Sequence, residues 1–164
     1  MPDNSADVTE DAALGGRLHL KQPRRGHRFG HDAVLLAATV PAQPGEHVVE
    51  FGAGVGLAGL AVALRAPEAR LTLLDIDPAL VVLAAQNAAR NGMGDRVRAL
   101  TLDVAASPPL WALAGLEPGC ADRVMMNPPF HDPARTQISP DAGRSLAHVG
   151  VDSALATWIA AGLR

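Results

Sequence analysis

The clearest hydrophobic pattern along the chain covers residues 47–65. His47–Phe51 is mostly apolar and β-branched, which predicts a buried strand. Alternating glycines follow, and the Ala- and Leu-rich stretch Leu57–Arg65 after them predicts a helix. Glycine has no side chain and tolerates positive φ, so a ligand can lie against the backbone of such a turn. The free N–H groups at the start of the helix favour a nucleotide-type ligand.

The alternation of strand and helix continues after this turn. The predicted strands are Leu71–Asp75, Val97–Leu102 and Asp122–Met126, and the predicted helices are Pro78–Asn91, Leu110–Leu116 and Ala154–Arg164. Strands that alternate with helices at this spacing predict a parallel sheet with right-handed crossovers. We therefore expect an α/β, Rossmann-like fold with helices on both faces of the sheet.

Two shorter regions precede this domain, which we place at residues 47–164. Residues 1–16 are polar and acidic, and we expect a flexible tail there. Residues 17–46 form a basic segment with a helix. Within it we expect a short strand at Leu18–Leu20, a loop at Gln22–Gly30 and a helix at Ala33–Val40, with Asp32 as its N-cap.

Composition limits the class of protein. The chain has 164 residues, enough for one domain with a core, and its 48% apolar content comes mainly from Ala, Leu and Val. The single cysteine, Cys120, fits a reducing compartment. There is no secretion signal and no apolar run of membrane-spanning length, so we expect a cytoplasmic protein without a membrane partner.

The glycine turn fits two cofactor patterns. Gly54-x-Gly56-x-x-Gly59, followed by Asp75, matches the dinucleotide fingerprint. Read from four residues earlier, Glu50-x-Gly52-x-Gly54-x-Gly56 resembles the pattern of S-adenosylmethionine-dependent methyltransferases. The turn alone does not choose between NAD and S-adenosylmethionine.

Acidic side chains end two of the other strands. Asp75 ends the second strand, where a carboxylate can accept both ribose hydroxyls, and Ile76 follows it. Asp77 is better placed to cap the helix that begins at Pro78. Asp103 ends the third strand, beside Val104, where a carboxylate can accept from the amine of adenine. These acids favour an adenosine-bearing cofactor of either kind.

The tetrapeptide Asn127-Pro128-Pro129-Phe130, after the fourth strand, favours S-adenosylmethionine over NAD as the cofactor. Its prolines fix the backbone and remove two N–H donors. The Asn127 side-chain oxygen and the Pro128 carbonyl can then both accept from one planar –NH2 group. Hydrogen bonds that suit this nitrogen as it becomes tetrahedral favour the transition state. Phe130 offers a flat face on which a base can stack.

The order of these motifs resembles the amino-group methyltransferases of the class I fold, which act on adenine N6, cytosine N4 or glutamine N5. The segment from Gln22 to Ala37 also resembles bacterial tRNA adenine-N6 methyltransferases, which modify the adenosine beside the anticodon of a valine tRNA. The resemblance implies that S-adenosylmethionine is the cofactor. It also implies that Asn127, Pro128 and Phe130 act at the target amine, and that the region of Phe29–Asp32 closes over the cofactor. The residues implied to hold the cofactor are Glu50, Gly52, Ala53, Gly54, Gly56, Asp75, Ile76, Asp103, Val104 and Asn127.

A nucleic acid, in particular a tRNA, is the expected partner. The net charge of −3 does not indicate nucleic-acid binding, but basic residues cluster between positions 17 and 28. Arg24, Arg25 and Arg28 suit phosphate contacts, and Phe130 and His131 complete the expected substrate site. The histidines are scattered without a metal-ligand spacing, so we expect no metal.

Several alternatives stay open from the sequence. A protein glutamine-N5 methyltransferase shares the tetrapeptide, a DNA adenine-N6 methyltransferase fits equally well, and a non-catalytic binding module is a rival from another class. A nicotinamide dehydrogenase fits least, because nothing after the fourth strand resembles a hydride-transfer site. The family resemblance implies further strands after Arg164. We therefore expect that the chain is a fragment, or that a partner covers the edge of the fourth strand. The oligomeric state is open.

Overall fold

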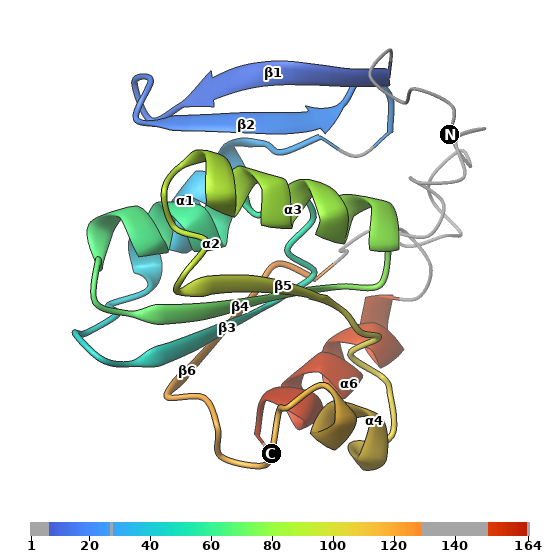
Figure 1. The fold of residues 1–164 in the computed structure, drawn as a ribbon. Helices are drawn as coiled ribbons and strands as arrows, with labels where there is room; N and C mark the ends of the chain where they lie inside the picture. The colour runs from blue at the N-terminus through green and yellow to red at the C-terminus, as the bar shows by residue number, and fades with distance from the viewer. Residues whose placement is uncertain (1–6, 27, 129–150, 164) are drawn as a thin grey trace.

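A parallel four-stranded sheet forms the centre of the computed structural model, which describes residues 7–26, 28–128 and 151–163. The strand order is β5-β4-β3-β6, and helices lie on both faces, with α1, α2 and α3 on one and α4 and α6 on the other (Figure 1). The strands are β3 (His47–Phe51), β4 (Arg70–Asp75), β5 (Val97–Thr101) and β6 (Arg123–Met126). The helices are α1 (His31–Thr39), α2 (Leu57–Arg65), α3 (Pro78–Arg90), α4 (Pro108–Leu113) and α6 (Val151–Gly162). Among these strands β6 has one neighbour, β3.

The register of the sheet brings the carboxyl ends of its strands together. Phe51 of β3 pairs with Leu74 of β4 on one side and with Met126 of β6 on the other. Asp75 pairs with Thr101 at the end of β5. The residues that follow these strands therefore lie along one edge of the sheet, where open parallel sheets bind their ligands.

Consecutive residues of β3 point into two separate core layers. Val48 is fully buried and belongs to the layer under α1, α2 and α3. Val49 and Phe51 belong to the layer under α4 and α6. The Phe51 ring makes edge-on contacts with Trp111 and Trp158, with centroids 5.5 Å and 6.4 Å apart. Burial on both faces explains why the strand is mostly apolar, with Glu50 as its one acid, and does not alternate.

The expectation of a flexible tail over residues 1–16 is wrong for residues 8–13. These residues form β1 (Val8–Ala13), which pairs antiparallel with β2 (Leu18–Pro23), so β2 extends beyond the predicted strand into the predicted loop. The hairpin lies over α3 (Figure 1). Its acidic residues have partners elsewhere in the fold: Glu10 pairs with Arg90 at 2.6 Å and Asp11 with Arg28 at 3.0 Å.

Two asparagines of α3 attach the hairpin to the domain. Asn87, fully buried, donates to the Lys21 carbonyl at 2.9 Å and accepts from the Lys21 N–H at 2.7 Å. It also donates to the carbonyl of Val55, in the glycine turn, at 3.0 Å. One turn later, Asn91 makes the same pair of bonds with the backbone of His19. The two amides thus act as a neighbouring strand would, satisfying the backbone groups of β2.

The predicted capping residues have mixed outcomes. Asp77 caps α3 as expected, because its carboxylate accepts from the Ala79 N–H at 2.8 Å. Asp32 does not cap α1, since the helix begins at His31 with Gly30 as its N-cap, and Asp32 lies in the first turn. Helix α4 also begins two residues earlier than predicted, at Pro108, because proline is well tolerated in the first turn of a helix.

The buried amide of Asn87 provides a test of how the hairpin is attached. We expect Asn87→Leu, which keeps the volume but leaves backbone groups of Lys21 and Val55 without partners, to lower the free energy of unfolding by about 2–4 kcal/mol in urea titration. Gln86 is exposed on the same helix and is the matched control. Gln86→Leu should change stability by less than about 0.5 kcal/mol. Equal losses in the two variants would contradict the proposed attachment.

Candidate functional site

A groove at the carboxyl edge of the sheet brings together three segments that are distant in sequence. These are the end of β3 with its glycine turn, the start of α1, and the end of β6. The groove is lined by Phe29, Gly30, Asp32, Ala33, Leu36, Glu50, Gly52, Ala53, Gly54, Val55, Leu57, Ala58 and Asn127. Among the predicted cofactor residues, Glu50, Gly52, Ala53, Gly54 and Asn127 line this groove. The remaining ones, Gly56, Asp75, Ile76, Asp103 and Val104, are not among its lining residues.

Glycine is required in the turn for conformation and for space. Gly52, Gly54 and Gly56 all have positive φ, at 66°, 56° and 89°. A Cβ at Gly52 would also lie 2.7 Å from the Trp158 ring of α6. Any other residue would be strained at these positions, so the turn presents bare backbone to the groove.

Asp75 holds the glycine turn in place. One of its carboxylate oxygens accepts from the Gly54 N–H at 2.7 Å, and the other accepts from the Asp77 N–H at 2.9 Å. The predicted ribose-binding acid is thus bonded to the predicted cofactor loop. Ile76, the next residue, is about half exposed at 53%, and its side chain offers an apolar surface beside the turn.

Glu50 is a buried acid beneath the same turn. Its side chain accepts from the Gly59 N–H at 2.8 Å, and the residue is 4% exposed. Burial raises the pKa of Glu50 to about 8, the Gly59 hydrogen bond partly opposes this, and the nearby charge of Asp75 adds to it. Without a ligand, Glu50 therefore stays protonated at neutral pH.

Asp103 and Val104 lie further along the same edge, at the end of β5. The Asp103 carboxylate accepts from the Ala105 N–H at 2.8 Å and is exposed, so it also orders its own loop. Val104 is buried at 6% exposure and packs in the core layer of Phe51. These residues are separated from the β3 turn by β4, at the same edge of the sheet.

Asn127 contacts the start of α1 across the groove. Its side-chain nitrogen donates to the Asp32 carboxylate at 2.5 Å, although the two residues are 95 positions apart. Asn127 is exposed and Pro128 is buried. The other predicted residues of this loop, Pro129, Phe130 and His131, lie outside the described residues.

The predicted phosphate-binding arginines differ from one another. Arg24 and Arg25 are exposed. Arg28 instead donates to the Thr9 hydroxyl, the Pro23 carbonyl and the Asp11 carboxylate, at 2.8–3.0 Å. These bonds hold the exposed Arg28 against the hairpin, and its contact with phosphates stays a prediction.

Gln22 is a buried polar residue that the sequence reading missed. It is 2% exposed, donates to the Asp11 carboxylate at 2.8 Å and accepts from the Phe29 N–H at 3.2 Å. Hydrogen bonds from Gln22 and Thr9 are the main cause of the lowered pKa of Asp11, and Arg28 contributes less. Its burial could have been predicted, because Leu18, Leu20 and Gln22 alternate along the strand and therefore face the same, inward side. Gln22 thereby links the hairpin to Phe29, in the wall of the groove.

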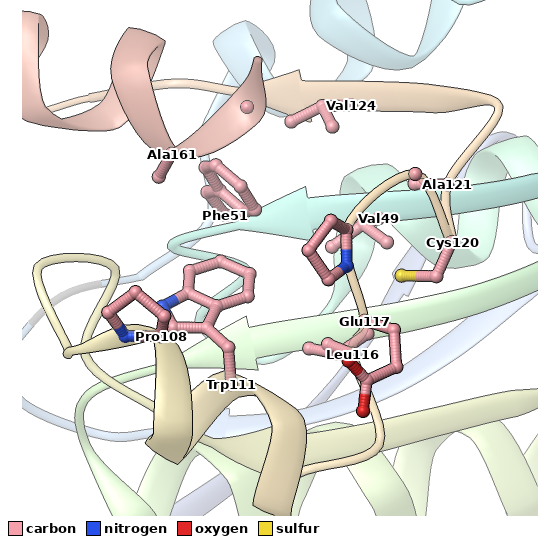
Figure 2. Close-up of a pocket in the computed structure, with 13 residues that line it drawn as sticks. Val49, Phe51, Pro108, Trp111, Leu116, Glu117, Cys120, Ala121, Val124 and Ala161 are labelled. Carbon is pink, nitrogen blue, oxygen red and sulfur yellow. The ribbon is translucent and has the colours of Figure 1, made fainter. Parts of the chain in front are cut away.

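A second pocket lies on the face of the sheet that α4 and α6 cover, between these two helices. Figure 2 shows the Phe51 ring pointing from β3 into this pocket, which is also lined by Val49, Trp111, Val124 and Ala161. The Trp111 Nε1 atom is buried and has no hydrogen-bond partner among the described residues. The pocket is mainly apolar and does not include the glycine turn. Within the described part of the chain, no helix is long and apolar enough to cross a membrane, and no cluster of three metal-binding side chains occurs.

The raised pKa of Glu50 predicts how stability depends on pH. Because the pKa is about 8 in the folded state and near 4.5 when exposed, the folded state holds the proton more tightly. The proton on Glu50 therefore contributes its full stabilisation below pH 4.5, and this contribution is lost as the pH rises to about 8. We expect Glu50→Gln to flatten the fall in the free energy of unfolding between about pH 5 and 8.5, and to be more stable than wild type at the upper end. Glu68→Gln, at an exposed position, is the control, and identical pH profiles for all three proteins would contradict the assignment.

Known proteins share this sequence pattern and this fold. A tRNA1(Val) (adenine(37)-N6)-methyltransferase of Porphyromonas gingivalis is 33% identical over 135 residues, which cover 80% of this chain and 51% of that protein. A ribosomal RNA small subunit methyltransferase C of Pseudomonas aeruginosa is 34% identical over 110 residues, covering 66% of this chain and 30% of that protein. The chain thus spans about half or less of the length of these relatives.

Solved structures confirm the fold class. TYW2 from P. horikoshii, solved in complex with MeSAdo, superimposes with a TM-score of 0.58 at 25% identity, covering 74% of this chain and 43% of that one. The profile of the methyltransferase small domain matches residues 27–150. Because this match includes the groove and most of the sheet, the chain belongs to the methyltransferase small domain family, as the order of its motifs led us to expect.

Proposed function

We propose that this protein is an S-adenosylmethionine-dependent N-methyltransferase that acts on an exocyclic amine of a nucleic acid, most specifically adenine N6 of a tRNA. The observation that carries the proposal is the position of Asn127 and Pro128 beside the glycine turn, at the ends of neighbouring strands. An amine acceptor and a cofactor loop must adjoin one another for direct methyl transfer.

The residues at the edge of the sheet fit S-adenosylmethionine. The bare backbone of Gly52–Gly56 accommodates a close ligand, and Glu50 and Asp75 lie beneath and beside it. We assign the methionine and ribose portions to these residues, and the adenine to Ile76, Asp103 and Val104 along the same edge. When bound, the cofactor supplies an electrophilic methyl group on a sulfonium.

The role of Asn127 and Pro128 follows from the chemistry of the target amine. The nitrogen of adenine N6 is conjugated with the ring and is therefore a weak nucleophile. The Asn127 side-chain oxygen and the Pro128 carbonyl both accept hydrogen bonds, and two acceptors favour the nitrogen as it becomes tetrahedral. Transfer in this arrangement needs no covalent enzyme intermediate, and Phe130 is proposed to stack on the base.

The relatives support a nucleic-acid substrate. The two described above are named for tRNA1(Val) adenine 37 and for small-subunit ribosomal RNA. The exposed side chains of Arg24 and Arg25 can contact phosphates, which position a nucleic acid without reading its sequence. We therefore propose tRNA as the substrate, with ribosomal RNA as the second candidate, and the cytoplasm as the location.

Cofactor binding is the first test. We expect S-adenosylhomocysteine, but not NAD, to bind the wild-type chain in isothermal titration calorimetry. Asp75→Ala should weaken this binding at least about tenfold, because the variant loses both a ligand contact and the bond that orders the Gly54 N–H. Asp95→Ala, an exposed acid at the far end of β5, is the matched control. Binding of NAD alone would overturn the proposal.

Methyl transfer tests the role of Asn127. We expect Asn127→Ala to lower the turnover of unmodified tRNA transcripts by about a hundredfold or more, because an acceptor for the reacting amine is lost. Its affinity for S-adenosylhomocysteine should change by less than about threefold, since Asn127 is only one of the many residues implied to hold the cofactor. The measurement is transfer of a labelled methyl group, with unmodified ribosomal RNA as the alternative substrate. Wild-type turnover in this variant would exclude the mechanism.

A further inference from the structure

The hydrogen bond between Asn127 and Asp32 determines which way the Asn127 amide faces. A carboxylate can only accept hydrogen bonds, so the group of Asn127 that faces Asp32 must be the nitrogen. The side-chain oxygen of Asn127 is thereby directed away from Asp32. Without such a partner, an exposed Asn side chain rotates between orientations that exchange its oxygen and nitrogen.

The local structure also fixes the Asp32 carboxylate. Asp32 lies in the first turn of α1, where the helix dipole favours a negative charge. Gly30, just before the helix, has an extended backbone that any residue can adopt, with φ of −122°. A Cβ at Gly30 would nevertheless lie 2.5 Å from the Asp32 Oδ1 atom. A side chain at this position would therefore displace the Asp32 carboxylate for lack of space, without any strain of the backbone.

We propose that Asp32 is a positioning residue for methyl transfer, which holds the nitrogen of the Asn127 amide so that its oxygen faces the incoming amine. This inference rests on the proposed function, in which that oxygen accepts from the target nitrogen. The carboxylate acts through Asn127, and Gly30 provides the space that the carboxylate occupies. Asp32, Gly30 and Asn127 all line the same groove.

The kinetic consequences separate positioning from cofactor binding. Asp32→Leu removes the acceptor at similar volume, and we expect it to lower kcat about ten- to a hundredfold, as a misplaced reacting group does. Although Asp32 lies in the segment expected to close over the cofactor, the KM for S-adenosylmethionine should change much less than kcat. Asp32→Asn can accept from Asn127 or donate to it, so it no longer fixes the orientation of the amide, and its kcat should lie between those of Asp32→Leu and wild type. Asp95→Leu, distant from the groove, is the control.

A reciprocal exchange of the two side chains is the sharpest test. Asn127→Asp alone places two carboxylates in contact and should lower kcat strongly. Adding Asp32→Asn restores one amide and one carboxylate with their positions exchanged, and should recover kcat at least about tenfold over Asn127→Asp alone. A purely structural role of Asp32 in α1 predicts no recovery, and that result would overturn the proposal.

Nuclear magnetic resonance gives a readout that does not depend on activity. We expect the side-chain amide signals of Asn127, identified by their loss in Asn127→Ala, to shift in Asp32→Leu and in Gly30→Ala. They should not shift in Gly94→Ala, because a Cβ at Gly94 meets only ordinary contacts, at 3.5 Å or more. If these signals are unchanged in Asp32→Leu, the positioning role is wrong. If they shift as expected while the wild type binds S-adenosylhomocysteine but transfers no methyl group to RNA, the proposed function fails and the contact between Asp32 and Asn127 stands.

Discussion

The close approach of α2 to the sheet is the constraint on which the site depends. A Cβ at Gly59 would lie 2.3 Å from a methyl group of Leu73 and 2.6 Å from the Glu50 carboxylate, and a Cβ at Gly56 would lie 2.9 Å from Leu73. Only glycine lets the first turn of the helix pack this closely on β3 and β4. The same approach brings the Gly59 N–H to the buried Glu50 side chain and leaves the backbone before α2 open to the groove.

Side-chain amides connect the parts of the site that secondary structure leaves separate. Asn87 joins β2 to the glycine turn through Val55, and Gln22 joins β2 to Phe29 in the opposite wall of the groove. At the end of β6, Asn127 joins the groove to the start of α1 by its bond to Asp32. Asn87 and Gln22 each donate and accept, so a single side chain satisfies two different segments. The groove is therefore shaped by hydrogen bonds between elements as much as by the sheet itself.

The sequence predicted the elements whose cause is local. Apolar strands, glycine turns and alternating helices are determined by neighbouring residues, and the fold class and the family resemblance they indicated are confirmed. The hairpin was missed because its acidic residues look unsuited to a strand until Arg90 and Arg28 are seen beside them. The bond between Asp32 and Asn127 was missed for a similar reason, since the two residues are 95 positions apart. Polar residues whose partners are this distant in sequence cannot be paired from a single sequence.

The attachment of the hairpin to α3 has a consequence for the order of folding. The bonds that hold β1 and β2 join residues 66–80 positions apart, from Lys21 to Asn87 and from Glu10 to Arg90. During synthesis β1 and β2 therefore have no docking surface until β3, β4 and α3 have left the ribosome after them. Contacts this distant in sequence form late, because the chain must first close a long loop. The hairpin is thus synthesised before α3 but docks only after α3 has formed, and the bond between Gln22 and Phe29 in the groove wall depends on this docking.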